Sequence, residues 1–191
     1  MLSTLTLFAR EGIGHGPFTK ERPYENLANN VSEIGGLFLP IVGVVATAIK
    51  WEERSVLDAA FALSSTIYAT NIYKIWVFEE RPSKERTSLI FDLPQGNGRG
   101  SFPSKHASMS FCGAALVHRA LGWKIAVPCY LLASAVGVSR VYIHRHYIHD
   151  VIAGAFLGSK IAFASGEWFN SLNWIPTPLD DGGVVNYTFT F

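Results

Sequence analysis

The sequence predicts an all-α protein, a single-domain helical bundle of about five to six helices. Its 191 residues suit one domain with a buried core. Five long apolar segments stand out, and none alternates apolar and polar residues as a half-buried strand does. Charged residues make up only 16% of the chain, against about 25% in an average globular protein. This scarcity of charge favours a bundle embedded in a lipid bilayer.

Each predicted helix rests on an apolar segment that is long enough for four turns or more. Alanine, leucine, isoleucine, valine and glycine dominate these segments. They cover approximately residues 34–50, 55–81, 104–119, 123–140 and 148–168.

The stretches outside these segments are predicted to be irregular. Residues 1–30 form an irregular or amphipathic N-terminal segment, without the charged start and long apolar run of a secretory signal. Residues 82–103 form a loop rich in glycine and charge. The tail, residues 173–191, contains prolines and paired aspartates and glycines, although its end at 184–191 alternates and allows one short strand. We expect one domain over residues 1–191.

The membrane prediction rests on charge and on aromatic residues. Uninterrupted apolar runs are about 15 residues long, shorter than the roughly 20 that a spanning helix needs. However, Asp58 and Lys160 are the main charges inside the segments, and aromatic rings gather toward both ends, as they do at bilayer interfaces. The alternative is a soluble bundle with aromatic ends. The aromatic residues are Trp51, Trp123 and Trp168 at one end and Tyr73, Trp76, Tyr142 and Tyr147 at the other.

A first polar motif closes the second apolar segment. Lys74 and Arg81 are seven residues apart, which is two helical turns and places both on one face. Pro82 is expected to end this helix. Arginine offers a planar two-pronged contact and lysine a compact charge, so the pair suits a phosphate group. The alternative is two solvated cations that pair with Glu79 and Glu80.

A second motif opens the third apolar segment. Ser104 is a favourable N-cap, and His106 lies two residues further along. The free amides of a helix start bind anions, so this motif also suits a phosphate. A capped helix with an exposed histidine is the alternative.

A third motif lies between the last two apolar segments. Arg140 ends one segment, His146 precedes the next, and Asp150 lies one turn beyond His146 on the same face. A carboxylate at that spacing can accept a hydrogen bond from one ring nitrogen and leave the other free to attack. His144 and His149 raise the possibility of a metal site, but no acidic or histidine cluster elsewhere in the sequence completes one. We therefore expect neither a metal nor a cofactor.

Together the three motifs read Lys-x6-Arg-Pro, Pro-Ser-x-His and Ser-Arg-x5-His-x3-Asp. This series resembles the signature of the phosphatidic acid phosphatase type 2 superfamily, which also contains bacterial acid phosphatases and vanadium haloperoxidases. The motifs occur in the right order over Lys74 to Asp150. One position departs from the pattern, because Lys105 stands where the family usually has glycine. Its side chain would either crowd the pocket or add a cation for a more highly charged substrate.

The resemblance implies a metal-independent phosphatase with His146 as the nucleophile, Asp150 as its orienting partner and His106 as the proton donor. The product of the first step would be a phosphohistidine. The remaining motif positions would bind the phosphoryl oxygens. These are Lys74, Arg81, Ser104, Lys105 and Arg140.

The expected substrate is a phosphate monoester or diphosphate of a membrane lipid, such as phosphatidate, phosphatidylglycerol phosphate, lipid A or a polyprenyl diphosphate. The expected partners are that phosphorylated lipid and the bilayer, and a net charge of +1 gives no indication of a nucleic-acid surface. The oligomeric state is left open. Three alternatives remain: a soluble periplasmic non-specific acid phosphatase, a vanadium-dependent haloperoxidase, although those enzymes are usually far longer, and a non-catalytic bundle.

The charge of the short loops predicts an orientation. Loops 50–54 and 118–124, at the end opposite the motifs, are modestly basic, and basic loops tend to stay in the cytoplasm. The site would then face the periplasm from a bacterial inner membrane.

Overall fold

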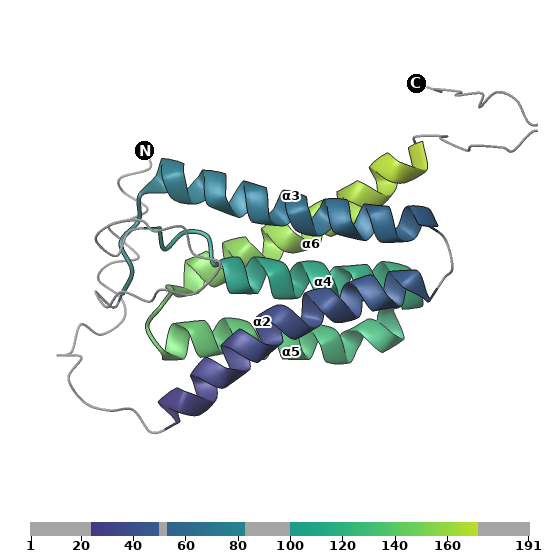
Figure 1. Ribbon diagram of the computed structural model, residues 1–191. Helices are drawn as coiled ribbons and strands as arrows, with labels where there is room; N and C mark the ends of the chain where they lie inside the picture. Colours follow the sequence, from purple (N-terminus) through teal and green to yellow (C-terminus); the bar gives the residue numbers. More distant parts are fainter. Residues whose placement is uncertain (1–23, 50–52, 83–99, 172–191) are drawn as a thin grey trace, which may run out of the picture.

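The computed structural model describes residues 24–49, 53–82 and 100–171. This part of the chain forms five α-helices that run up and down in one bundle (Figure 1). The central helix, α4, packs against all four of the others. The predicted all-α fold and its five helical segments are therefore confirmed. The helices are α2 (Glu25–Ala48), α3 (Glu53–Val77), α4 (Lys105–Leu121), α5 (Trp123–Tyr142) and α6 (Ile148–Ser171).

Two predicted boundaries were wrong. Helix α2 begins at Glu25, so residues 25–30, at the end of the segment predicted to be irregular or amphipathic, are helical. Asparagines in this stretch have low helix propensity and therefore weakened the helix signal in the sequence. Helix α3 ends at Val77 rather than near residue 81, because Phe78 has a φ of 49°, which a right-handed helix cannot continue. Arg81 therefore lies beyond the helix, and the prediction that it shares a helix face with Lys74 was wrong. The predicted tail 173–191 lies outside the described residues.

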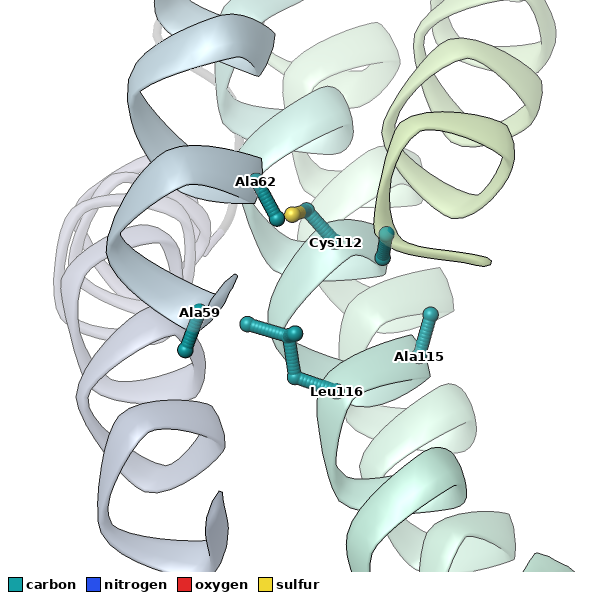
Figure 2. Close-up of a cluster of buried hydrophobic side chains, with 6 residues drawn as sticks. Ala59, Ala62, Cys112, Ala115 and Leu116 are labelled. Carbon is teal, nitrogen blue, oxygen red and sulfur yellow. The ribbon is translucent and has the colours of Figure 1, made fainter. Parts of the chain in front are cut away.

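Small side chains fill the core of the bundle. Figure 2 shows alanines of α3 and α4 packed around Cys112 and Leu116. Cys112 is buried and free, as expected of a small core side chain. Glycines bring the helix backbones still closer. A Cβ atom at Gly158 would lie 1.9 Å from the carbonyl oxygen of Ser108, and one at Gly113 would lie 2.3 Å from that of Leu39. Helices in membranes pack through small residues in this way.

Large apolar side chains point outward from the bundle. Phe38 of α2, Leu131 of α5 and Phe156 of α6 are all more than half exposed. Water would disfavour so much exposed apolar surface, whereas lipid would not. Among the described residues, α2 and α5 have the length and composition to cross a bilayer. These features indicate that the bundle is embedded in a membrane.

Five of the aromatic residues predicted to lie at the two ends of the bundle are exposed there. Trp123 and Trp168 lie at the end where α4 and α6 finish, whereas Tyr73, Trp76 and Tyr142 lie at the end where α4 and α6 begin. Trp51 lies outside the described residues. Rings at both ends fit the two interfaces of a bilayer.

A buried ion pair joins three helices at the end marked by Trp123 and Trp168. Arg119 of α4 contacts the Asp58 carboxylate of α3, and its guanidinium also donates to the carbonyl of Ala162 in α6 at 2.7 Å. Gly166 makes room for this arginine, since a Cβ atom there would lie 1.9 Å from the guanidinium. This ion pair gives Asp58, one of the two main charges within the predicted apolar segments, a partner of opposite charge. The other, Lys160, is exposed, with its ammonium 5.7 Å from the centre of the Phe156 ring.

Candidate active site

The helix ends opposite this ion pair bring the three sequence motifs together. Helix α3 finishes there, α4 and α6 begin there, and α5 finishes there. Two hydrogen bonds hold the segments at this end together. Lys74 Nζ donates to the carbonyl of Gly100 at 2.5 Å, and the Ser104 amide donates to the carbonyl of Asp150 at 3.0 Å. Residues that are far apart in sequence therefore share one site because the helices are antiparallel.

His146 and Asp150 are both deeply buried, with exposed fractions of 2% and 0%. Nδ1 of His146 lies 3.4 Å from Oδ2 of Asp150, although the contact lacks hydrogen-bond geometry. The same carboxylate oxygen accepts bonds from the Ser101 hydroxyl at 2.5 Å and from the Tyr147 amide at 2.9 Å. The carboxylate is thus fixed beside the imidazole, on the face that the spacing predicted, but the hydrogen bond from the ring nitrogen is not formed.

A tight turn between α5 and α6 presents His146. The carbonyl of Arg140 accepts bonds from the amides of Arg145 and His146, at 3.0 and 3.3 Å. His144 adopts a φ of 52° in this turn, a conformation that histidine tolerates better than bulkier or β-branched residues. The turn therefore links the position of the predicted nucleophile to that of a predicted phosphate-binding arginine.

The charges around His146 show which groups converge on it. Burial and the positive charges of Lys74, Arg140, Arg81 and His106 lower the pKa of His146 well below its usual value. Burial and neighbouring cations both disfavour the protonated ring. His146 is therefore neutral near pH 7 and retains a lone pair, with three cations and a second imidazole close by.

The start of α4 supplies two further predicted residues. Ser104 occupies the N-cap position, but its side chain makes no capping bond. Its Oγ is buried and has no hydrogen-bond partner in the described parts of the chain. Lys105 is the first residue of the helix and is 8% exposed. A buried hydroxyl and a buried lysine thus lie together at a helix N-terminus, as an anion site requires.

Helix α2 contributes side chains that sequence reasoning missed. Oε2 of Glu33 lies 3.3 Å from Nε2 of His106, and Oε1 of the same carboxylate lies 3.2 Å from a guanidinium nitrogen of Arg140. That nitrogen also donates to the Ser32 hydroxyl at 3.1 Å. Glu33 belongs to no spaced motif, and its one sequence signal is an acidic residue next to an apolar segment.

A second histidine also contacts Asp150. Nε2 of His149 lies 2.8 Å from Oε1 of Glu79 and 3.3 Å from Oδ1 of Asp150. The His149 ring is stacked against the rings of Phe102 and Tyr147. One donor atom from each of Glu79, His149 and Asp150 lies within 4.8 Å of the others, so these three could hold a metal ion. His149 instead forms an ion pair with each of the two carboxylates.

This arrangement can transfer a phosphoryl group. A neutral buried imidazole can attack phosphorus, a second imidazole can move the proton, and several cations can offset charge on the phosphoryl oxygens. The fold and the site together define a helical phosphatase, a phosphoric ester hydrolase.

Comparison with known families agrees with this class. The sequence profile of the PAP2 superfamily matches residues 55–174. The chain belongs to the PAP2 superfamily, as the three motifs predicted. The matched region begins inside α3, so α2 and Glu33 lie outside it.

Individual relatives match this chain over different lengths. Lipid A 1-phosphatase from Porphyromonas gingivalis is 34% identical over 82 residues, which are 41% of this chain and 18% of that protein. Decaprenylphosphoryl-5-phosphoribose phosphatase from Mycobacterium tuberculosis is 30% identical over 128 residues, 67% of this chain and 68% of that protein. The chain therefore spans less than a fifth of the first relative and about two thirds of the second.

Two solved structures share the fold. Aquifex aeolicus LpxE superposes with a TM-score of 0.61 at 17% identity, covering 87% of this chain and 94% of that one. The transmembrane PAP2 type phosphatidylglycerolphosphate phosphatase from Bacillus subtilis superposes with a TM-score of 0.58 at 19% identity, covering 90% and 87%. At these identities the likeness establishes the helical fold.

Proposed function

We propose that this chain hydrolyses a phosphate monoester or diphosphate of a membrane lipid through a phosphohistidine at His146. The observation that carries the proposal is the buried His146 ring, which lies 3.4 Å from the Asp150 carboxylate and close enough to Lys74, Arg140 and Arg81 for their positive charges to lower its pKa. The ring lies at the end of a bundle whose outer surface is apolar.

In the first step, His146 attacks phosphorus. With Nδ1 facing Asp150, a proton on Nδ1 leaves the lone pair on Nε2. A bond forms between Nε2 and phosphorus while the bond from phosphorus to the leaving oxygen breaks. His106 donates a proton to that oxygen, which departs as an alcohol, or as a phosphate when the substrate is a diphosphate.

In the second step, water attacks phosphorus and the bond to Nε2 breaks. His106, now neutral, accepts a proton from the water, so that inorganic phosphate is released and both histidines regain their initial states. The phosphoryl oxygens are held throughout by the remaining predicted groups, which stabilise the negative charge without a metal. These groups are Lys74, Arg81, Arg140, Ser104 Oγ and the amide and ammonium of Lys105.

Several observations support a lipid substrate. The site lies at one end of an apolar bundle, where a head group could enter while its chains remain in hydrocarbon. Among the relatives are a lipid A 1-phosphatase and a decaprenylphosphoryl-5-phosphoribose phosphatase. A soluble acid phosphatase, the alternative, would leave the outward apolar side chains in water. Candidate substrates are phosphatidate, phosphatidylglycerol phosphate, lipid A and polyprenyl diphosphates.

The proposed orientation places the site on the periplasmic face of a bacterial inner membrane. Basic residues at the opposite end support this through the positive-inside tendency. Arg119, which the sequence assigned to that end, lies within α4 and pairs with Asp58. Its charge is therefore neutralised. Lys124, which is exposed in the first turn of α5, is the basic residue of the predicted loop 118–124 that still supports the orientation.

Phosphate release from these lipids in detergent micelles tests the proposal, with soluble esters measured in parallel and a chelator added to half of the samples. We expect turnover of lipid substrates, no effect of the chelator and no turnover by His146→Ala. Labelled phosphate should remain on the wild-type chain after an alkaline quench and be lost in acid, as for phosphohistidine. Activity on soluble esters alone would exclude the lipid substrate, and a full rate for His146→Ala would exclude the nucleophile.

A further inference from the structure

The proton donor and α2 meet at Glu33, a residue that the three motifs do not include. We propose that Glu33 is a positioning residue for His106, so that the site contains a second imidazole–carboxylate pair and is incomplete without α2. This inference rests on the proposed function, because it assigns Glu33 a part in the same proton transfer.

The geometry divides one carboxylate between two site residues. Oε2 of Glu33 faces Nε2 of His106 at 3.3 Å, and Oε1 faces Arg140 at 3.2 Å. His106 and Glu33 are 73 residues apart in sequence, so the contact exists because α2 crosses the start of α4. Glu33 thus contacts the group proposed to protonate the leaving oxygen and a group proposed to hold phosphate.

Helix α2 is shaped to bring its backbone against the His106 ring. Gly36 lies three residues after Glu33, on the same helical face. A Cβ atom at Gly36 would lie 2.8 Å from Cδ2 of His106, so any larger residue would push the ring away. The ring is therefore held between its own helix and α2 rather than pointing into open solvent, and its exposed fraction is only 17%.

The surrounding charges explain why the proton donor needs a carboxylate. His106 must carry a proton to protonate a leaving oxygen, yet Arg140, a second cation, contacts the other oxygen of the same Glu33 carboxylate, and a neighbouring cation disfavours an imidazolium. Glu33 offsets this charge at hydrogen-bond range. Its contact with Nε2 also fixes the ring orientation, as the carboxylate does in a catalytic triad.

Glu33 could affect catalysis by two routes, and the leaving group separates them. A loss that acts through Arg140 weakens the hold on phosphate and slows all substrates alike. A loss that acts through His106 slows substrates whose leaving oxygen needs a proton, such as an alkoxide, and spares those that leave readily as an anion, such as 4-nitrophenolate.

The experiment compares a short-chain phosphatidate with 4-nitrophenyl phosphate in detergent micelles. General acid catalysis is commonly worth about 10²–10⁴-fold, so Glu33→Gln, which removes only the charge, should lower kcat/KM about 10- to 100-fold for phosphatidate and about threefold for 4-nitrophenyl phosphate. Glu33→Asp keeps the charge and should retain the wild-type ratio between the two substrates. Glu25→Gln, on the same helix two turns earlier, is the matched control and should leave both rates unchanged.

A double-mutant cycle with His106→Ala completes the test. If Glu33 acts through His106, then Glu33→Gln should lower phosphatidate turnover by no more than about the threefold expected for 4-nitrophenyl phosphate once His106 is replaced. An undiminished effect in the His106→Ala background, or an equal loss on both substrates, would overturn the inference. The Glu33 variants are compared only after the wild type has been shown to release phosphate and to depend on His146. A negative result for Glu33 would then overturn this inference and leave the proposed function standing. If the wild type does not release phosphate, the proposed function itself is wrong.

Discussion

The main-chain amide of Ser104 donates a hydrogen bond of 3.0 Å to the carbonyl of Asp150. This bond joins the start of α4 to the first turn of α6, and Gly154 permits the close approach, since a Cβ atom there would lie 2.6 Å from the Ser104 carbonyl oxygen. His106 lies two residues from one side of the bond and His146 four residues from the other. A backbone hydrogen bond therefore fixes the helix starts that carry the two proposed catalytic histidines relative to each other. Because this bond does not involve side chains, mutations of neighbouring side chains can test the chemistry of the two histidines separately.

Ser101→Ala should slow catalysis without weakening substrate binding. The Ser101 hydroxyl donates to Oδ2 of Asp150 at 2.5 Å, and this oxygen also faces His146. A hydrogen bond to a charged group is worth about 1.5–3 kcal/mol, so we expect kcat to fall about tenfold with KM unchanged. Steady-state kinetics on one lipid substrate would measure this. Ser134→Ala, an exposed serine of α5, is the control, and an unchanged kcat for Ser101→Ala would exclude this support.

The acid limb of the pH–rate profile should lie well below the usual range of histidine. Burial and then nearby cations lower the pKa of His146, and the ring can attack only when it is neutral. Activity should therefore persist as pH falls below about 6.5, the ordinary histidine value. Removing a cation by Lys74→Met should raise the pKa and move the acid limb of kcat/KM to higher pH, whatever the loss in rate. A shift to lower pH would contradict the assigned cause.

The motifs were predictable because their chemistry lies in residue types at fixed local spacings. His146 and Asp150 are one turn apart in sequence and in space. Glu33 was not predictable, because its partner His106 is 73 residues away and only the crossing of α2 over α4 joins them. The position of Arg81 was also missed. The helix ends at a left-handed Phe78, and a bulky aromatic residue gives no sign in the sequence that it will adopt this conformation. Local periodicity thus predicted the helices and motifs, while tertiary contacts determined the rest of the site.

Asp58→Asn should lower stability and spare the site. Arg119 and Asp58 pair at the opposite end of the bundle, and Asp58 is almost wholly buried. Breaking a buried ion pair costs about 3–5 kcal/mol because the remaining charge loses its partner. We expect a lower melting temperature in detergent but an unchanged KM in assays well below it. Lys160→Gln, an exposed position, should melt as the wild type does.

Replacing both partners provides a second measurement of this ion pair. The variant Asp58→Ala with Arg119→Leu removes both charges, so it should recover part of the lost stability. If Asp58→Asn melted at the wild-type temperature, the bonds of Arg119 to the Ala162 carbonyl and the Ser165 hydroxyl would have to satisfy its guanidinium without the carboxylate.

Lys105→Met and Lys105→Gly test why this chain departs from the glycine usual in the superfamily. Lys105 is buried at the start of α4, beside the unpartnered Ser104 hydroxyl. If its ammonium binds a second phosphate, both variants should raise KM for a lipid diphosphate about tenfold more than for the matching monophosphate, since one charge-assisted contact is worth about 1.5–3 kcal/mol. Lys124→Ala, an exposed lysine at the other end, is the matched control. The opposite explanation is crowding, under which Lys105→Gly, but not Lys105→Met, would lower KM for both substrates because only glycine frees the space near the backbone.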